Sequence, residues 1–367
     1  MTLGRSTARE RVARGWERGF SPAETPLVGA LAGGYRSLLA ARDWLYGRGV
    51  LKSRRLDRPV VAIGNVTVGG TGKTPAVMLV VETLLQLGHR PAVVSRGYGR
   101  RTDGVRVVAD TAKIFVEPED AGDEPFLLAR RLPGVPVVVG ANRGEAAQLA
   151  VERFDASVIV LDDAFQHRTL DKDLEIVMAR AHAPWGNGRL LPAGPLREPL
   201  AALARAHVVV ATGARDADDV ADVMPAIARY APGVPVIPAM YVATECWDAR
   251  RMQPASLDDL RSARVLGFAG IGAPEGFRRT LEELGATVTG LVAFDDHHWY
   301  TSTDVGRLVE RARALGADAL VTTEKDWVRL LRLGAVRMPL WVVSVRLELL
   351  GALDAWHAAF VRTCPTS

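Results

Sequence analysis

Cysteine is scarce in this 367-residue chain, which has only Cys246 and Cys364. The two lie far apart, so they offer neither a disulfide framework nor the spacing of a metal-binding motif, and we expect a reducing compartment. Long uncharged apolar runs are also missing. The longest candidate, Pro26–Ala41, contains Arg36, and no apolar core follows the arginine-rich N-terminus. The sequence therefore predicts neither a membrane-spanning helix nor a secretory signal.

Internal repeats and low-complexity tracts are absent as well, and Gly and Pro are not enriched enough to indicate disorder. An apolar fraction of 48% is sufficient for a buried core. The length predicts two domains, or one large α/β unit with an appendage.

Positive charge is concentrated at the N-terminus. Residues 1–58 contain twelve Arg or Lys against five acids, although the whole chain carries only +4. An apolar stripe at helical spacing lies in the same segment, formed by Leu27, Leu31, Tyr35, Leu38 and Leu39. A basic amphipathic helix of this kind suits an anionic membrane surface. Packing of the stripe on the protein's own core explains the pattern equally well, and nucleic-acid binding is a weaker alternative.

The most informative stretch is a glycine-rich segment between two apolar runs, Pro59–Ile63 and Pro75–Leu87. A strand, a glycine turn and a helix in this order present backbone N–H groups to a phosphate. Lys73 would add a point charge and Thr74 a hydroxyl for magnesium. We therefore predict a nucleoside triphosphate cradle made of Thr67, Val68, Gly69, Gly70, Thr71, Gly72, Lys73 and Thr74.

Apolar runs alternate with helical patterns along the rest of the chain, which is typical of a parallel sheet covered on both faces. We predict a doubly wound, mostly parallel α/β fold like that of P-loop NTPases, with a second, smaller α/β domain. The expected division is an arm at residues 1–58, a nucleotide-binding domain at 59–240 and a smaller domain at 241–367. Ligands of such folds bind at the carboxyl ends of strands.

Several polar groups follow predicted strands. Asp162 and Asp163 end an apolar run, where an acid helps hold magnesium in phosphoryl-transfer enzymes of this fold. Ser95 and Arg96 begin a glycine- and arginine-rich turn that suits an anionic acceptor. Asp123 precedes a helix, so it is either an N-cap or a carboxylate aimed at an acceptor hydroxyl.

Two further segments are candidates for the site. Leu190–Pro199 is too rich in Pro and Gly for an element interior and too apolar for an ordinary loop, so we expect it to face a ligand. Phe294–Tyr300 closes a strand with polar and aromatic groups. Its adjacent histidines, His297 and His298, would point to different sides of a strand, so proton handling is favoured over a shared zinc.

Taken in order, these segments resemble the tetraacyldisaccharide 4′-kinase family. The resemblance rests on GNVTVGGTGKTP, SRGYG, GDEP, LDDxxQHR, LLPAGPLREP, AGIGxPxxF, FxDHHxY and TTEKD, between about Leu27 and Asp326. Ala164 stands where a glycine is common in the family, and residues 1–23 form an extension without a match.

The resemblance implies an enzyme that transfers the γ-phosphate of ATP to the 4′-hydroxyl of the tetraacyldisaccharide 1-phosphate precursor of lipid A. It implies ATP as co-substrate, Mg²⁺ as cofactor, and a peripheral location at the cytoplasmic face of the inner membrane, reached through the N-terminal helix. We infer no nucleic-acid partner and no obligate protein partner.

The resemblance also assigns residue roles. It implies Asp123 as the base, His297 as its hydrogen-bonding partner and Lys73 as the phosphate-binding lysine. The implied metal residues are Thr74, Asp162 and Glu198, and the implied substrate-binding residues are Ser95, Arg96, Asp163, Gln166, His167 and Arg197.

Two other functions remain open at this level. A regulatory or partitioning NTPase has a similar GGTGKT cradle but would hydrolyse its nucleotide without a lipid. A small-molecule kinase or ligase that acts on a soluble acid would not need the basic apolar arm.

Overall fold

The computed structural model describes residues 15–16, 20–21, 24–334 and 336–365. The expected extension at residues 1–23 therefore falls largely outside the described residues. The chain divides into two compact units, each assembled from separate stretches of sequence. Unit 1 comprises Met1–Lys73, Val158–Met240 and Leu349–Ser367, and unit 2 comprises Thr74–Ser157 and Tyr241–Glu348.

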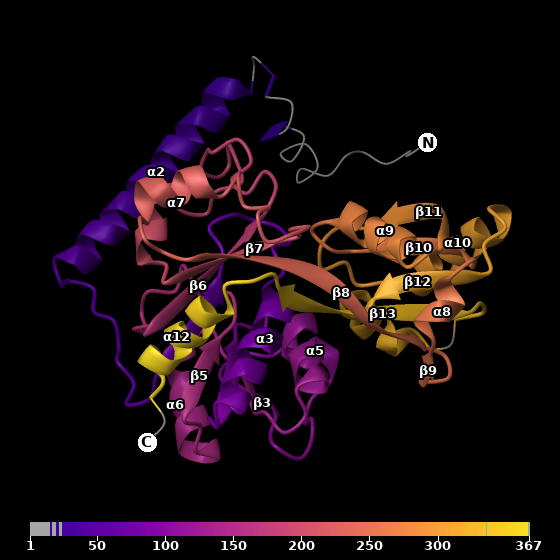
Figure 1. The fold of residues 1–367 in the computed structure, drawn as a ribbon, viewed down its shortest axis with the longest axis horizontal. Helices are drawn as coiled ribbons and strands as arrows, with labels where there is room; N and C mark the ends of the chain where they lie inside the picture. Colours follow the sequence, from indigo (N-terminus) through magenta and orange to yellow (C-terminus); the bar gives the residue numbers. More distant parts are fainter. Residues whose placement is uncertain (1–14, 17–19, 22–23, 335, 366–367) are drawn as a thin grey trace. The chain divides into compact units, whose positions relative to one another are not determined.

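Unit 1 contains a parallel sheet in the order β8-β7-β6-β1-β5 (Figure 1). Its strands are β1 (Val60–Gly64), β5 (Val158–Leu161), β6 (Leu174–Arg180), β7 (Val208–Thr212) and the first residues of β8 (Val236–Asp248). β1 is buried along its whole length and pairs Val61 with Val160 of β5 and Ile63 with Ile176 of β6. Near-continuous Val and Ile runs form such strands because both faces of a parallel sheet are covered.

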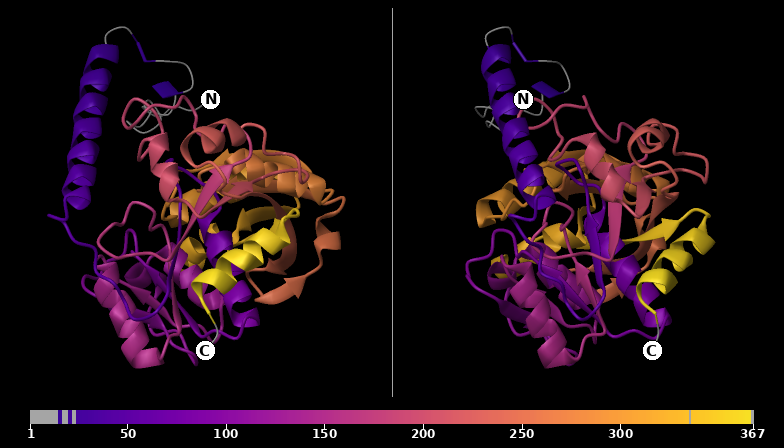
Figure 2. Two further views of the ribbon diagram at one scale, coloured as in Figure 1. Left: turned by 60° about the vertical axis from the view of Figure 1, so that its left-hand side comes forward. Right: turned by 90° about the vertical axis from the view of Figure 1, so that its left-hand side faces the viewer.

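The helices of unit 1 are α2 (Thr25–Gly47), the 3₁₀ helix η1 (Leu200–Arg205), α7 (Met224–Tyr230) and α12 (Leu353–Thr363). α12 buries Trp356 and Phe360, whereas Leu39 is the buried residue of α2. Figure 2 shows α2 as one long helix at the side of unit 1. Within the described ranges, α2 included, no helix combines the length and the apolar character that crossing a bilayer demands.

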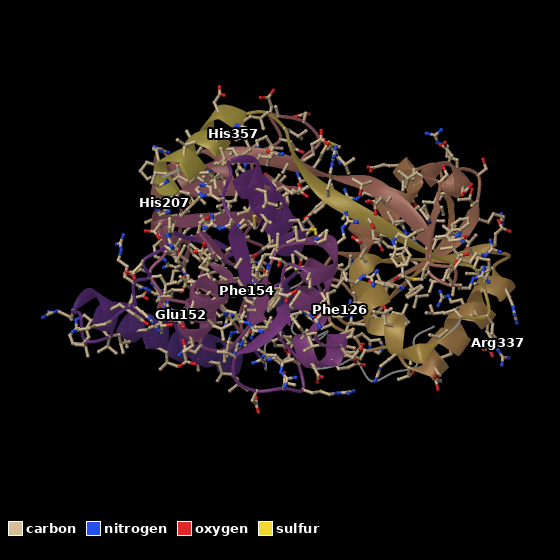
Figure 3. All side chains as sticks on the ribbon, turned by 90° about the horizontal axis from the view of Figure 1, so that it is seen from below. Phe126, Glu152, Phe154, His207, Arg337 and His357 are labelled. Carbon is tan, nitrogen blue, oxygen red and sulfur yellow. The ribbon has the colours of Figure 1, made fainter. Side chains whose placement is uncertain are left out.

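The first stretch of unit 2 contributes three neighbouring strands, in the order β2-β4-β3. β2 (Pro91–Ser95) and β4 (Val137–Val139) are parallel, and β3 (Arg106–Ala109) is antiparallel to β4. The helices of this stretch are α4 (Pro118–Ala121), α5 (Asp123–Arg131) and α6 (Arg143–Phe154), while α3 (Lys73–Gln86) begins at the junction of the units. Figure 3 draws the side chains of these helices, Phe126 and Phe154 among them.

The second stretch of unit 2 adds the parallel strands β11-β10-β12-β13, at Thr287–Ala293, Arg264–Ala269, Ala319–Thr323 and Leu340–Leu349. β9 (Gln253–Ala255) pairs antiparallel with the end of β8. The helices are α8 (Leu257–Leu260), α9 (Pro274–Glu283), α10 (Ser302–Ala314) and α11 (Glu324–Leu330), followed by the 3₁₀ turn η2 (Leu331–Leu333). The core of this stretch contains Leu266, Phe268 and Tyr300 on one side of the sheet and Val265, Leu281 and Val321 on the other.

The mostly parallel α/β fold predicted from the sequence is confirmed, since the pairings around β1, β7, β10 and β12 are parallel. Residues 59–240, however, do not group as one compact body, because 74–157 cluster with the C-terminal stretch. The reason is visible in unit 2, where α5 packs against α11. The division into an arm, a nucleotide domain and a smaller domain stays a prediction about how the parts of the protein act.

Candidate active site

The glycine-rich loop joins β1 to α3 in the order that the sequence predicts. Gly69 and Gly72 adopt φ values of +106° and +78°, a region that favours glycine. A Cβ at Gly64 would come within 2.6 Å of Phe165, so the strand end also requires glycine. Because α3 begins at Lys73, the unpaired N–H groups of its first turn adjoin the loop. This backbone geometry is typical of a phosphate-binding cradle.

Side chains from three parts of unit 1 hold the cradle. Asn65 Nδ2 donates to Thr71 Oγ1 at 3.0 Å, and Thr212 Oγ1 donates to the carbonyl of Thr71 at 3.2 Å. Gln166 Nε2 donates to the carbonyl of Asn65 at 2.8 Å. Gln166, predicted to bind the acceptor, therefore supports the cradle in this structure.

The segment Leu190–Pro199, predicted to face a ligand, runs along the cradle. The N–H of Val68 donates to the carbonyl of Pro195 at 2.8 Å, and the N–H of Arg197 donates to the carbonyl of Val66 at 2.7 Å. These bonds place the Arg197 side chain next to the cradle residues.

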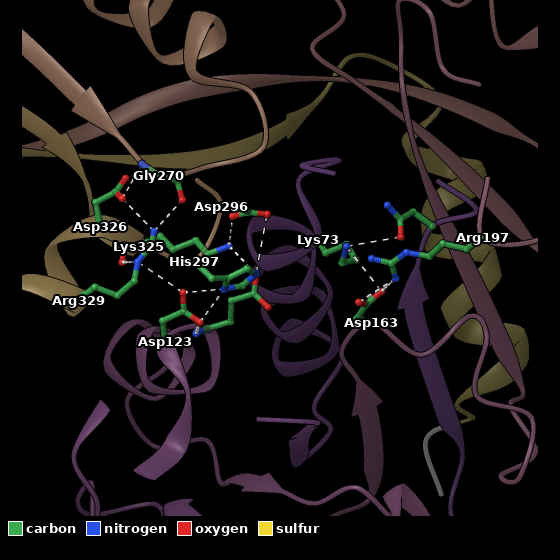
Figure 4. Close-up of polar contacts among 12 residues, drawn as sticks. Lys73, Asp123, Asp163, Arg197, Gly270, Asp296, His297, Lys325, Asp326 and Arg329 are labelled. Atoms are coloured by element: carbon green, nitrogen blue, oxygen red, sulfur yellow. Dashed lines mark hydrogen bonds and ion pairs between the residues drawn. The ribbon is translucent and has the colours of Figure 1, made fainter. Parts of the chain in front are cut away.

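Lys73 is held by a carboxylate and an amide (Figure 4). Its Nζ lies 3.6 Å from Asp163 Oδ1 and 3.5 Å from Asn65 Oδ1. Arg197 Nη1 donates to both oxygens of Asp163 at 3.0 Å. Burial alone would raise the pKa of Asp163, but Lys73 and Arg197 outweigh it and lower the pKa below its usual range. The three side chains form one charged cluster beside the cradle.

The donor set for a magnesium ion is small and made of oxygens. Asp162 is buried at the carboxyl end of β5, beside β1, and Thr74 follows Lys73 in the first turn of α3. Carboxylate and hydroxyl oxygens are hard donors that suit Mg²⁺. Within the described part of the chain, no three His, Cys, Asp or Glu residues cluster as a metal site. This sparse set fits an ion that takes one or two protein ligands and completes its shell with phosphates and water.

Glu198, the third predicted metal residue, has other partners in this structure. It is fully buried, one oxygen bonds to Arg42 of α2, and the other accepts from Arg205 Nη2 at 2.5 Å. Tyr35, one helical turn before Leu39, donates its hydroxyl to the carbonyl of Arg197 at 2.7 Å. These contacts argue for a structural role that ties α2 to residues 197 and 198, and the metal role of Glu198 stays a prediction.

Asp123 and His297 meet within unit 2, although 174 positions separate them. Asp123 is the first residue of α5 and is buried, and His297 follows β11 in a turn. His297 Nδ1 lies 3.0 Å and 3.2 Å from the two carboxylate oxygens of Asp123. The backbone of His297 has φ +63°, an unusual conformation for a residue with a side chain. The pairing of carboxylate and imidazole is suited to orienting a general base.

The surroundings of Asp123 are positively charged. Arg329 Nε lies 3.6 Å from Asp123 Oδ2, and Lys325 is also nearby. Burial alone would raise the pKa of Asp123, but the hydrogen bond from His297 and the charges of Lys325 and Arg329 lower it to about 2. Asp123 is therefore an ionised acceptor in the free protein.

A buried polar network centred on Asp326 holds the Arg329 side chain in place. Asp326 Oδ1 accepts from Arg329 Nη2 at 2.9 Å, from the Tyr300 hydroxyl at 2.7 Å and from the N–H of Gly270 at 2.8 Å. Arg329 Nη2 also donates to the carbonyl of Gly270 at 3.0 Å. Because every partner is buried, the network fixes the guanidinium that faces Asp123.

The turn after β2 packs against the start of α5. A Cβ at Gly97 would come within 2.8 Å of the carbonyl of Ala121, and one at Gly122 would meet the carbonyl of Tyr98 at 3.0 Å. The Tyr98 ring lies 5.2 Å from the His297 ring, measured between centroids. Of the predicted acceptor residues on this turn, Ser95 is buried and Arg96 is exposed.

The other two candidate histidines, His167 and His298, have partners of their own. His167 Nε2 contacts Thr169 Oγ1 at 2.8 Å, and His298 Nε2 contacts Asp304 Oδ2 at 3.1 Å. His297 and His298 both follow β11 rather than lying in it, so the strand alternation expected to separate them does not apply. They nevertheless face different partners.

Sequence reasoning missed Arg42 and Arg329 and left Lys325 without a role. The sequence did contain a signal for Lys325 and Arg329. Together with Asp326 they recur at the spacing of one helix face directly after a strand. Arg42 offered none, because its partner Glu198 is 156 positions away.

Known proteins match this chain over most of its length. The family model described as tetraacyldisaccharide-1-P 4′-kinase matches residues 25–362. A tetraacyldisaccharide 4′-kinase of Anaeromyxobacter dehalogenans (strain 2CP-1) is 45% identical over 344 residues, which is 90% of each chain. One of Syntrophus aciditrophicus (strain SB) is 40% identical and covers 93% of this chain and 94% of its own.

A solved structure of a similar protein has the same fold. The "apo" form of LpxK from Aquifex aeolicus, in complex with ATP, has a TM-score of 0.71 and 29% identity, with 93% of this chain and 98% of that chain covered. With a family model that spans nearly the whole chain and relatives above 40% identity, this protein belongs to the tetraacyldisaccharide 4′-kinase family.

Proposed function

We infer that the protein transfers the γ-phosphate of ATP to the 4′-hydroxyl of the tetraacyldisaccharide 1-phosphate precursor of lipid A. Family membership supports the reaction, and the cradle around Lys73 supports a nucleoside triphosphate. One observation favours a kinase over a nucleotide-hydrolysing switch: the buried Asp123 is paired with His297, as a base for an acceptor hydroxyl should be. The ATP bound to the Aquifex relative supports ATP as the donor.

The proposed chemistry is direct transfer. The acceptor oxygen forms a bond to the γ-phosphorus while the bond to the β-phosphate oxygen breaks, and the hydroxyl proton passes to Asp123. Because the transition state is loose, charge and positioning contribute more than proton removal. Lys73 would leave Asp163 for the phosphate oxygens, while Arg197 keeps Asp163 neutralised. Asp123 then needs only to accept a proton late.

A magnesium ion would complete the proposed nucleotide site. Asp162 and Thr74 would hold it, and the ion would neutralise charge on the phosphates. His297 would orient the Asp123 carboxylate through Nδ1.

We also propose that α2 binds the membrane surface. Leu27, Leu31 and Leu38 are 65%, 54% and 70% exposed, and they occupy neighbouring positions on one helix face. An exposed apolar face beside basic residues suits shallow insertion into an anionic leaflet, where a lipid acceptor resides. We propose that the protein acts peripherally at the cytoplasmic face of the inner membrane.

The test is an assay with radiolabelled ATP and the disaccharide monophosphate in detergent micelles. We expect labelled lipid with the wild type, and losses of about 10²- to 10⁴-fold in kcat for Lys73→Ala and Asp123→Ala with unchanged circular dichroism. Near-wild-type turnover in Asp123→Ala would refute the base assignment. Equal ATP hydrolysis with and without the lipid would favour the switch NTPase.

A further inference from the structure

His297 presents its two ring nitrogens to groups of opposite charge (Figure 4). Nδ1 faces the Asp123 carboxylate at 3.0 Å, and Nε2 lies 3.5 Å from Lys325 Nζ. A ring nitrogen that faces a carboxylate has to donate, and one that faces an ammonium has to accept. The two contacts together select one form of the ring, neutral with its proton on Nδ1 and its lone pair on Nε2.

Lys325 is well placed to remain an ammonium. Its Nζ donates to Glu124 Oε1 of α5 at 3.0 Å and to Asp296 Oδ1 at 3.2 Å, and its side chain is 17% exposed. Burial alone would lower the pKa of Lys325, but Glu124, Asp296 and Asp123 outweigh it and raise the pKa. An ammonium has three N–H donors, and this one has three acceptors: two carboxylates and His297 Nε2.

We propose that Lys325 is a positioning residue of the phosphoryl transfer, which holds His297 in its Nδ1–H form so that the ring orients Asp123. The proposal rests on the function proposed above. It gives the TTEKD segment a role beyond packing, because α11 places Lys325 next to His297. On the same helix, Asp326 holds Arg329, and Arg329 lies against Asp123.

The other charged groups around the ring explain why a cation is needed. Asp123 and Glu124 approach from α5, and Asp296 Oδ2 lies 3.8 Å from His297 Nε2. Arg329 of α11 faces Asp123 rather than the ring, and Tyr98 contributes an uncharged ring. Without the ammonium, Asp296 would favour a proton on Nε2, and the carboxylates together would favour an imidazolium. An imidazolium would bind Asp123 as an ion pair and weaken it as a base.

The experiment uses the full-length protein and two readouts. Long-range ¹H–¹⁵N spectra of the histidine rings report the protonated nitrogen without ATP or lipid, and His297→Gln identifies the signal. The kcat of lipid phosphorylation is then measured against pH. Lys325→Met removes the ammonium, and Lys325→Arg restores a cation. Arg131→Met is the matched control, because Arg131 also joins α5 to α11 through Glu324 but does not contact the His297 ring.

We expect a neutral Nδ1–H ring in the wild type at pH 7.5, and an Nε2–H ring or an imidazolium in Lys325→Met. The Lys325→Met kcat should fall about 10- to 100-fold with the KM for ATP unchanged. The acidic limb of its kcat–pH profile should also differ from that of the wild type. Lys325→Arg should recover part of the activity, and Arg131→Met should leave the ring form and the acidic limb in place.

An Nε2–H ring in the wild type, or an unchanged ring signal in folded Lys325→Met, would overturn the proposal. The wild-type spectrum decides this even if Lys325→Met does not fold. Absence of lipid phosphorylation by the wild type would count against the proposed function instead, since the ring spectrum does not depend on turnover.

Discussion

Two neighbouring histidines give a sharp test of the site at the scale of single residues. His297 contacts Asp123, whereas His298 contacts Asp304 at the start of α10 and stacks on Phe294 at 4.8 Å. We expect His297→Ala to lower kcat by about 10- to 100-fold, because Asp123 loses the group that orients it. His298→Ala should reduce thermal stability more than turnover. Steady-state kinetics and thermal melts of both variants measure the difference, and the reverse order in kcat would move the role by one residue.

The lowered pKa of Asp123 predicts an acid-dependent loss of stability. The carboxylate has a pKa of about 2 in the folded protein and about 3.9 in an unfolded chain. A depressed folded pKa stabilises the protein above the unfolded pKa, and this contribution is lost as pH falls from about 4 to about 2. Wild type should lose roughly 1 kcal/mol from this group by pH 3.

Asp123→Asn is the variant for this measurement because it removes the titrating group and keeps the size of the side chain. Its free energy of unfolding, from urea titrations at several values between pH 5 and pH 3, should fall less steeply than that of the wild type. Parallel curves would show that the carboxylate is not stabilised by His297, Lys325 and Arg329 as the contacts indicate.

Helix α2 has a buried side, which packs on the protein, and an exposed apolar side. Leu39 is 8% exposed, while Leu27, Leu31 and Leu38 are open to solvent. Replacing the three exposed leucines by serine should weaken binding to anionic vesicles by at least about 100-fold, because each buried leucine side chain contributes about 1.5 kcal/mol or more. Unfolding free energy should change little, since the replaced side chains are exposed.

The control for this prediction lies on the same helix. Leu39→Ala should cost about 2 kcal/mol or more of stability and leave vesicle sedimentation unchanged while the protein is folded. Sedimentation of the triple serine variant at the wild-type level would show that α2 serves structural packing, the alternative left open by its sequence.

The strands near the cradle were predictable from the sequence because their signal is local. Pro59–Ile63 and Ser157–Asp162 are runs of Val, Ile and Leu, and the structure places β1 and β5 there as neighbours. The antiparallel β3 has only four residues and lies partly exposed, so it leaves no such run. Its position follows from pairing with β4 rather than from its own composition.

The candidate site divides in the same way. The glycine loop and the acids after β5 can be predicted from their positions directly after predicted strands. The Lys325 contacts cannot, because they join three segments that are distant along the chain. An ion pair between α5 and α11 has no local pattern, because the two helices are brought together only by the tertiary packing of unit 2. Such contacts are the part that sequence reasoning could not supply.

At the scale of the whole molecule, the two units are interleaved along the sequence. Unit 1 closes with residues 349–367, and unit 2 needs both 74–157 and 241–348. Within unit 2, Lys325 pairs with Glu124 at 3.0 Å and Arg131 with Glu324 at 3.5 Å. Each unit is therefore completed only by residues that are made late in translation.

This arrangement predicts that the boundary expected near residue 240 does not mark a separable domain. A fragment of residues 1–240 would lack α12, whose Trp356 and Phe360 are buried in unit 1, and would leave Glu124 and Arg131 without their partners on α11. Losing two large buried aromatic side chains alone costs about 3 kcal/mol or more each, a large share of a typical domain's stability. We expect the fragment to bind a hydrophobic dye and to melt without a cooperative transition, while the full chain melts cooperatively. A sharp melt of the fragment, together with tight nucleotide binding, would show instead that residues 1–240 fold on their own.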